Sequence, residues 1–333
     1  MTLIAHRDFL YLIVEFYKYK CRGQKGCIRG DDFVNRAVKI FTLAFRGEKK
    51  EAVFSELRSR LQDDTDVVML PEMWLGDDFP VQTAESDLLK EIAALAAEHH
   101  CYIICPLTFF DGENRAERFN SALVFDRKGE LIYRYDKAFP WWNEFDFVPP
   151  VKPGDKAGIF DTDFGRCGIA ICFDVNFPCL WEEMARGGAE IVFWPSDYSA
   201  GRSLQAHAIN YHYYIVTATR EGDSALIDLN GDEIQYNKSD GITSTYYTVD
   251  LDREIFHENF NIEKIAALTA AELGIKVEKR YLREQWIVLS GDKDTSVKAL
   301  AKEYNIEPLR KYIFRSQREI NGNVCRGPSS EQV

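Results

Sequence analysis

The chain has 333 residues, of which 41 are Lys or Arg and 53 are Asp or Glu, so its formal net charge is −12. Hydrophobic residues make up 46% and charged residues 28%, which is typical of a folded globular protein and excludes a wholly disordered one. The negative charge argues against non-specific binding of nucleic acid. The sequence has no run of about 18 apolar residues, so it predicts no membrane-spanning helix.

The compact-domain pattern begins near Arg36, so residues 1–35 are interpreted as a poorly packed N-terminal extension. Its apolar run Phe9–Val14 is flanked by acids and is followed by no small-residue cleavage site, which argues against a signal peptide. The eight cysteines are therefore expected to be free thiols in a cytoplasmic protein. Cys101 and Cys105 lack metal-ligand spacing and are predicted to be small buried side chains.

Strand and helix patterns alternate along residues 36–250. The expected strands are Val38–Phe45, Asp66–Leu70, Tyr102–Leu107, Asn120–Asp126, Glu130–Tyr135, Gly168–Ile171, Glu190–Trp194, Tyr214–Thr219, Ala225–Leu229, Glu233–Tyr236 and Ile242–Val249. The expected helices are Glu48–Leu61, Ser86–His99, Leu180–Gly187 and Leu204–His212. Because some strands form hairpins while others alternate with helices, we expect an α/β domain with a mixed sheet or two sheets covered by helices.

Residues 251–333 are predicted to form a helical C-terminal extension. Helices are expected over residues 262–273 and 296–304, the latter capped by Thr295 or Ser296, and from Pro308 onward. Two short helices joined tightly, with a locally basic second helix, could form a DNA-binding helix-turn-helix. The loose spacing and the acidic chain favour a helical arm that packs on the core or on a second subunit.

Three chemically active residues directly follow predicted buried strands. They are Glu72, Lys137 and Cys172, and the carboxyl ends of strands are where open α/β sheets build their sites. A thiolate can attack a carbonyl or nitrile carbon, a carboxylate can take the thiol proton, and an ammonium can stabilise the developing negative charge. Taken singly, each has a structural interpretation: a turn cap, a surface charge and a core thiol. A Cys/His hydrolase that pairs Cys172 with His207 or His212 is an alternative, although no motif links them.

The segments that carry these residues resemble the three signature segments of the carbon–nitrogen hydrolase (nitrilase) superfamily, in the same order. They are Leu70–Leu75, Tyr133–Lys137 and Gly165–Asp174, and the similarity extends over residues 36–250. The resemblance implies a four-layer αββα sandwich with Cys172 as nucleophile, Glu72 as general base and Lys137 as oxyanion stabiliser. It also implies an oxyanion contact from the Phe173 amide and a second glutamate in the loop after the lysine, for which Glu144 is the candidate. No metal or organic cofactor is implied, and a homodimer or higher homo-oligomer is expected.

The segment Cys172–Trp181 is similar to that of aliphatic amidases and formamidases, which implies a small amide-type substrate and no nucleic-acid or membrane partner. Val175 and Asn176 stand where D-carbamoylases of the family have paired arginines, which argues against that specificity. The alternatives are an N-carbamoyl amidohydrolase or nitrilase of the same superfamily, and a non-catalytic binding or regulatory protein that uses the C-terminal helices. The aromatic residues expected to wall the substrate pocket are Trp74, Trp141, Trp142, Phe173 and Tyr198.

Overall fold

A computed structural model describes residues 36–76, 83, 85–111, 116–271 and 273–326. The expected N-terminal extension, residues 1–35, lies outside the described residues. The described residues divide into two compact units, one within residues 38–249 and the other comprising the described residues outside that range. In the described part of the chain, no helix is both long and apolar enough to cross a membrane.

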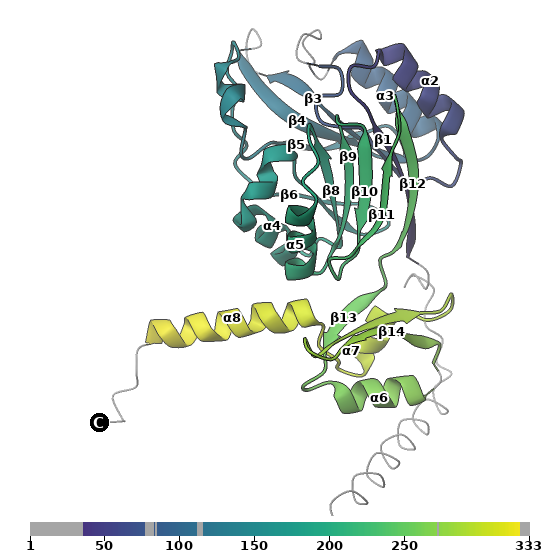
Figure 1. The fold of residues 1–333 in the computed structure, drawn as a ribbon, viewed down its shortest axis with the longest axis vertical. Helices are drawn as coiled ribbons and strands as arrows, with labels where there is room; N and C mark the ends of the chain where they lie inside the picture. Colours follow the sequence, from purple (N-terminus) through teal and green to yellow (C-terminus); the bar gives the residue numbers. More distant parts are fainter. Residues whose placement is uncertain (1–35, 77–82, 84, 112–115, 272, 327–333) are drawn as a thin grey trace, which may run out of the picture. The chain divides into compact units, whose positions relative to one another are not determined.

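The unit of residues 38–249 contains two six-stranded sheets (Figure 1). The first has the order β12-β1-β2-β3-β4-β5, in which β1, β2 and β3 run parallel to one another. Its strands are β12 Thr243–Asp250, β1 Ala37–Ala44, β2 Val67–Met69, β3 Tyr102–Asp111, β4 Glu117–Phe125 and β5 Leu131–Asp136. The β4–β5 hairpin predicted from the sequence is present and antiparallel.

The second sheet has the order β11-β10-β9-β8-β7-β6, with β7, β8 and β9 parallel. Its strands are β11 Glu233–Lys238, β10 Asp223–Ile227, β9 Tyr214–Thr219, β8 Ile191–Ser196, β7 Arg166–Ile169 and β6 Gly158–Asp161. The edge strand β6 was not among the predicted strands. The two sheets pack face to face, and the hydroxyls of Thr42 and Ser224 lie 2.8 Å apart in the buried layer between them.

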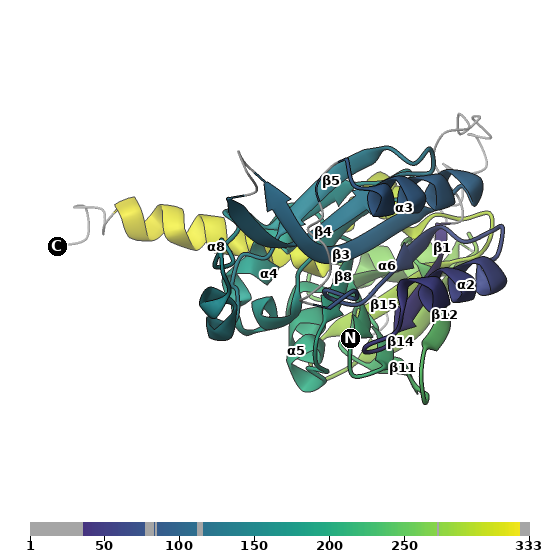
Figure 2. The same cartoon turned by 90° about the horizontal axis from the view of Figure 1, so that it is seen from above.

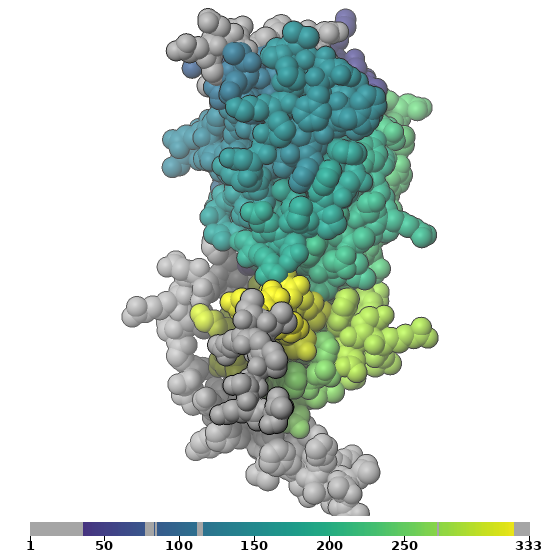
Figure 3. All heavy atoms as spheres, turned by 90° about the vertical axis from the view of Figure 1, so that its left-hand side faces the viewer, coloured from purple at the N-terminus to yellow at the C-terminus, as the bar shows by residue number. Residues whose placement is uncertain are grey.

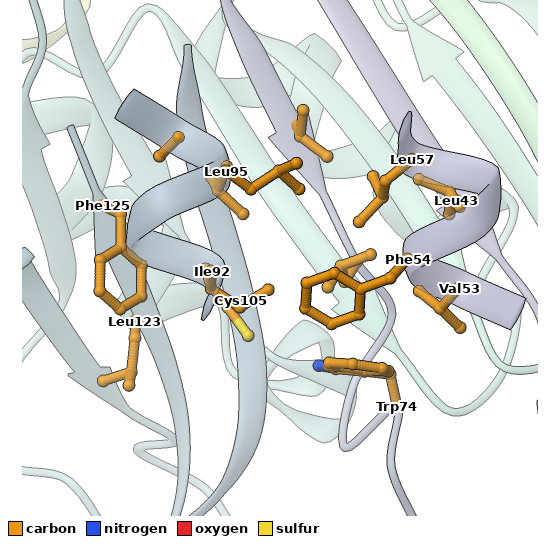
Figure 4. Close-up of a cluster of buried hydrophobic side chains, with 14 of the residues drawn as sticks. Leu43, Val53, Phe54, Leu57, Trp74, Ile92, Leu95, Cys105, Leu123 and Phe125 are labelled. Atoms are coloured by element: carbon orange, nitrogen blue, oxygen red, sulfur yellow. The ribbon is translucent and has the colours of Figure 1, made fainter. Parts of the chain in front are cut away.

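Helices cover the outer faces of both sheets, as Figures 1 and 2 show. Helices α2 (Lys50–Arg60) and α3 (Asp87–Glu98) cover the first sheet, and α4 (Pro178–Arg186) and α5 (Arg202–Tyr211) cover the second. The core under α2 and α3 packs Phe54 and Leu95 against strand residues such as Cys105 (Figure 4). This arrangement is the expected four-layer αββα sandwich. In Figure 3, blue and green segments that are distant in sequence meet on one face of this unit.

The second unit contains the expected helices and also a three-stranded sheet that the sequence analysis missed. Its helices are α6 Ile262–Ala270, α7 Val297–Glu303 and α8 Leu309–Arg326, and its strands, in the order β13-β15-β14, are β13 Glu254–His257, β15 Trp286–Gly291 and β14 Ile275–Tyr281. Ser296 caps α7 as predicted, because its hydroxyl accepts a 3.1 Å hydrogen bond from the Ala299 amide. This unit has a hydrophobic core of its own, which includes Phe256, Leu289 and Val297.

Candidate active site

The candidate site is built from the carboxyl ends of strands in both sheets. Glu72 follows β2 and Lys137 follows β5 in the first sheet, and Cys172 follows β7 in the second. Strands β2 and β7 belong to the parallel part of their sheets, whose strand ends leave a crevice between successive connections. The fold therefore brings together three side chains from distant parts of the sequence, since 100 positions separate Glu72 from Cys172.

Lys137 and two glutamates form a buried ionic cluster. The Lys137 ammonium lies 2.9 Å from Glu72 Oε1 and 2.7 Å from Glu144 Oε2. The side-chain amide of Asn120, on β4, donates to Oε1 of both glutamates, at 2.7 and 2.8 Å. Because Asn120 and Lys137 both bridge the two carboxylates, the four side chains form one fixed unit.

The charge state of Lys137 follows from this cluster. Burial alone would lower the Lys137 pKa, but the nearby Glu72 and Glu144 carboxylates outweigh burial and raise the pKa above its usual value. Lys137 is therefore an ammonium throughout the neutral pH range. A fixed cation in a dry site is suited to stabilising negative charge as it develops on a substrate.

Glu72 keeps one oxygen unused. Its Oε1 accepts from Lys137 and Asn120, whereas its buried Oε2 has no hydrogen-bond partner among the described residues. A buried carboxylate oxygen without a donor is costly, and such an oxygen is a ready proton acceptor. The structure thus leaves one oxygen of Glu72 free for proton transfer.

Cys172 stands at a sharp turn between β7 and a short 3-10 helix, η3 (Cys172–Asn176). Its φ of 48° lies in the left-handed region that side-chain-bearing residues seldom adopt, and the Trp194 indole donates to its carbonyl at 3.1 Å. Burial and the Glu72 charge raise the pKa of the Cys172 thiol, while Lys137, the Asp197 amide and Ser196 oppose this shift. The resting residue is a thiol that must lose its proton to react.

Glu144 is held by a short 3-10 helix, η2 (Trp142–Asp146). Its Oε2 accepts from the Trp141 amide at 2.7 Å, and its carbonyl accepts from the Val151 amide at 3.1 Å. The loop after Lys137 therefore folds back to place this carboxylate on the lysine. The structure brings together all four residues that the sequence analysis selected as catalytic.

These residues open onto a cavity of about 580 Å³. Of the five aromatic residues expected at the pocket, Trp141, Phe173 and Tyr198 line it. Trp74 does not line the cavity. Its indole is directed toward α2 and is buried against Phe45 and Phe54 in the core (Figure 4). Trp142 is 65% exposed and also lies outside the lining.

The histidines of the alternative Cys/His site are not part of this lining. His207 lies in α5, stacks on the indole of Trp181 at 4.3 Å and bonds to the Val175 carbonyl. Its burial lowers its pKa, so it is a neutral packing residue. His212 is buried at the end of α5. Cys101 and Cys105 are fully buried, as predicted, and form no disulfide.

Six polar residues of the site were missed by the sequence analysis, among them Asn143 and Asn176 of the cavity lining. Asn120 holds the two glutamates, and Arg46, Asp197 and Arg220 line the cavity. The last three follow β1, β8 and β9, so the rule that selected Glu72, Lys137 and Cys172 would have selected them too had it been applied to every strand. Asn120 lies within β4 and gives no such signal.

Comparisons with known proteins concern the family and the fold of the chain. A family model described as carbon-nitrogen hydrolase matches residues 49–255. Among curated proteins, a citrullinase of Francisella tularensis is 29% identical over 167 residues, covering 49% of this chain and 57% of the relative. An omega-amidase of Saccharomyces cerevisiae is 26% identical over 167 residues, covering 45% of this chain and 57% of the relative. The chain thus spans little more than half the length of these relatives.

Solved structures show the same fold at lower identity. A Saccharomyces cerevisiae member of branch 10 of the nitrilase superfamily matches with a TM-score of 0.57 and 20% identity, covering 65% of this chain and 92% of that structure. A carbon-nitrogen hydrolase from Helicobacter pylori matches with a TM-score of 0.53 and 19% identity, covering 66% of this chain and 91% of that structure. At this identity the likeness concerns the fold.

Proposed function

The chain belongs to the carbon–nitrogen hydrolase family, and from that membership we propose that it hydrolyses a small amide through a thioester on Cys172. The observation that carries the proposal is the buried set of Glu72, Lys137 and Cys172 on one cavity, with one Glu72 oxygen unused. A structural ion pair would need neither a thiol at a strained turn nor an unpartnered carboxylate oxygen.

In the first half of the reaction, the Cys172 sulfur attacks the carbon of the substrate amide. Glu72 takes the thiol proton as the sulfur–carbon bond forms, because the raised thiol pKa makes a free thiolate scarce. The negative charge that develops on the substrate oxygen is stabilised by Lys137 and by the backbone amide of Phe173. The carbon–nitrogen bond then breaks, and Glu72 passes its proton to the leaving nitrogen.

In the second half, water replaces the amine. Glu72 takes a proton from the water while the water oxygen bonds to the thioester carbon. The carbon–sulfur bond then breaks, and Glu72 returns that proton to the Cys172 sulfur. Glu144 and Asn120 bond to Lys137 and Glu72, and we assign both as positioning residues. The products are a carboxylic acid and ammonia or an amine.

The sequence resemblance and the cavity support a small amide as the substrate. Trp141, Phe173 and Tyr198 supply apolar and aromatic walls around the reacting groups. A small amide fits a cavity of about 580 Å³. An N-carbamoyl compound or a nitrile would use the same thiol and lysine, and these substrates are distinguished by assay.

The test is ammonia release by the full chain and by its Cys172→Ala variant. The panel contains short aliphatic amides, formamide, N-carbamoyl amines and acids, and simple nitriles. Cys179→Ala is the matched control, because Cys179 is an exposed cysteine outside the cavity lining. Activity that survives in Cys179→Ala and disappears in Cys172→Ala supports the proposal. Equal ammonia from Cys172→Ala and the unmodified protein contradicts it.

A second pair of variants separates this proposal from a Cys/His hydrolase. Lys137→Ala should abolish turnover, because the oxyanion then loses its cation. His207→Ala should lower stability while leaving detectable turnover in the folded fraction, since His207 packs on Trp181. Loss of turnover in folded His207→Ala, with retention in Lys137→Ala, would favour the histidine mechanism instead.

A further inference from the structure

The cavity that holds Cys172 is lined by a second charged cluster, which the proposed reaction does not use. It consists of Arg46, Asp197 and Arg220. Arg46 follows β1 of the first sheet, and Arg220 follows β9 of the second. The Arg220 amide donates to the Ser196 carbonyl at 2.8 Å, which fixes the start of this connection beside the end of β8.

Two guanidinium groups face a single carboxylate oxygen in this cluster. Arg46 Nη2 lies 3.1 Å and Arg220 Nη1 lies 3.2 Å from Asp197 Oδ1. Two positive charges against one negative charge leave a surplus of one positive charge. Oδ1 is buried and has no hydrogen bond of good geometry, so the N–H groups of neither arginine are aimed at it. Asp197 therefore brings the two arginines together: its backbone carbonyl accepts a 3.1 Å hydrogen bond from Arg46 Nη2, whereas its buried carboxylate oxygen Oδ1 occupies no donor of either guanidinium group.

The cluster is close to the nucleophile because both share Asp197. The backbone amide of Asp197 interacts with the Cys172 sulfur, while its side chain contacts Arg46 and Arg220. Only one residue thus separates the sulfur from the guanidinium groups. A ligand that reaches both must be short, with its reactive carbon and its second polar group a few bonds apart.

We propose that Arg46 and Arg220 bind a carboxylate on the substrate, so that the substrate is a short amide that also carries an acid group. This inference rests on the proposed function, and it names the substrate class for that site. The planar guanidinium fork matches the two oxygens of a carboxylate and is never deprotonated in proteins. The Lys137 ammonium is already held by two glutamates, so it does not compete for the acid group.

The kinetic test compares matched amides that differ only in the acid group. Succinamic acid is paired with butyramide, and glutaramic acid with pentanamide. The unmodified protein should hydrolyse one acidic amide with a kcat/KM at least tenfold above that of its neutral partner. Arg220→Gln and Arg46→Gln should each reduce this preference by about ten- to a hundredfold, the range expected for a charge-assisted hydrogen bond. Arg186→Gln is the control, because Arg186 pairs with Glu182 on the surface of α4.

A binding measurement keeps the inference testable apart from turnover. Calorimetric titration of Cys172→Ala protein with the same four amides should show tighter binding of an acidic member. The added Arg220→Gln change should remove this difference, and Arg220→Lys should restore part of it. The inference is overturned if neither acidic amide binds or reacts better than its neutral partner, or if the arginine variants weaken both members of a pair equally.

These outcomes separate the inference from the proposed function. Cys172-dependent hydrolysis of amides without any preference for an acid group rejects the carboxylate site and leaves the thiol mechanism. Arginine-dependent binding of an acidic amide without Cys172-dependent hydrolysis supports the carboxylate site and rejects the mechanism.

Discussion

The backbone amide of Phe139 donates a 2.9 Å hydrogen bond to the carboxylate of Asp174. This bond joins the loop after Lys137 to the turn that carries Cys172. Asp174 also accepts from the Ile171 amide and the Tyr135 hydroxyl, both at 2.8 Å, and it is fully buried. One buried carboxylate therefore fixes the segments that carry Lys137 and Cys172 relative to each other.

Asp174 predicts a specific pH dependence of stability. Burial raises the pKa of Asp174 from 3.8 to about 6. Between these values the folded state binds a proton that the unfolded state has released, so the stabilisation is full below about pH 4 and is lost as the pH rises through about 6. The free energy of unfolding of the unmodified protein, minus that of Asp174→Asn, should fall by about 1.4 kcal/mol per pH unit across this window.

Urea denaturation of both proteins at several pH values measures this difference, and the variant cancels the titration of all other groups. A difference that stays constant, or rises with pH, would mean that Asp174 is ionised throughout.

We expect loss of the Lys137 charge to lower the free energy of unfolding strongly. Lys137→Met leaves Glu72 and Glu144 buried side by side without their cation, which should lower the free energy of unfolding by about 3–5 kcal/mol. The double variant Lys137→Met/Glu144→Gln should recover part of this loss because one uncompensated carboxylate has been removed. Denaturant unfolding checks both values, and equal stability of the single and double variants would contradict the shared-charge description.

The two glutamates should differ in kinetic effect. Glu72→Gln removes the proton acceptor and should lower kcat on the order of 10³-fold. Glu144→Gln should lower kcat less, because its assigned role is to position Lys137 and an amide oxygen can still accept a hydrogen bond from that ammonium. Steady-state rates on one amide test this order. A loss in Glu144→Gln as large as in Glu72→Gln would show that Glu144 also transfers protons.

Among the cysteines whose side chains the structure describes, Cys179, Cys172, Cys101 and Cys105 should label with alkylating reagent in a fixed order. Exposed Cys179 should react fastest, and Cys172 should react more slowly, with a rate that rises with pH because its thiol pKa is raised. Cys101 and Cys105 should stay unlabelled in native protein, since they are fully buried and burial raises the pKa of each to about 12. Peptide mass spectrometry over pH 6–9 provides the readout. A Cys172 rate independent of pH would indicate a resting thiolate.

The strand and helix patterns predicted an α/β domain with helix-covered sheets, because several strands are buried on both faces and α3 is amphipathic. The four-layer sandwich itself was implied by the family resemblance. Strand β2 has three buried residues, and α3 presents Leu88, Ile92 and Leu95 on one face. The β13-β15-β14 sheet was missed for a physical reason. Most of β14 is exposed and charged. Strand β13 is only four residues long, and its partner β15 comes after both α6 and β14 in the sequence. Only β15 carries a strand pattern, the buried run Ile287–Ser290, and the sequence analysis overlooked it.

The residues of the site also differ in how far the sequence could predict them. Glu72, Lys137 and Cys172 lie in recognisable segments, whereas Trp74 could be placed only by the structure. Its aromatic side chain was expected to wall the pocket, but the indole lies against Phe54 in the core (Figure 4). The cluster of Arg46, Asp197 and Arg220 joins residues from three separate connections, and its charge surplus is a property of their meeting in space.

The placement of these residues at separate strand ends has an evolutionary consequence. The reacting groups come from the connections after β2, β5 and β7, whereas the arginine cluster comes from those after β1, β8 and β9. A descendant of this protein can therefore exchange one ligand for another by altering the second set of connections while inheriting the first intact. In such a lineage, we expect substitutions at positions 46, 197 and 220 to appear before any substitution of Cys172.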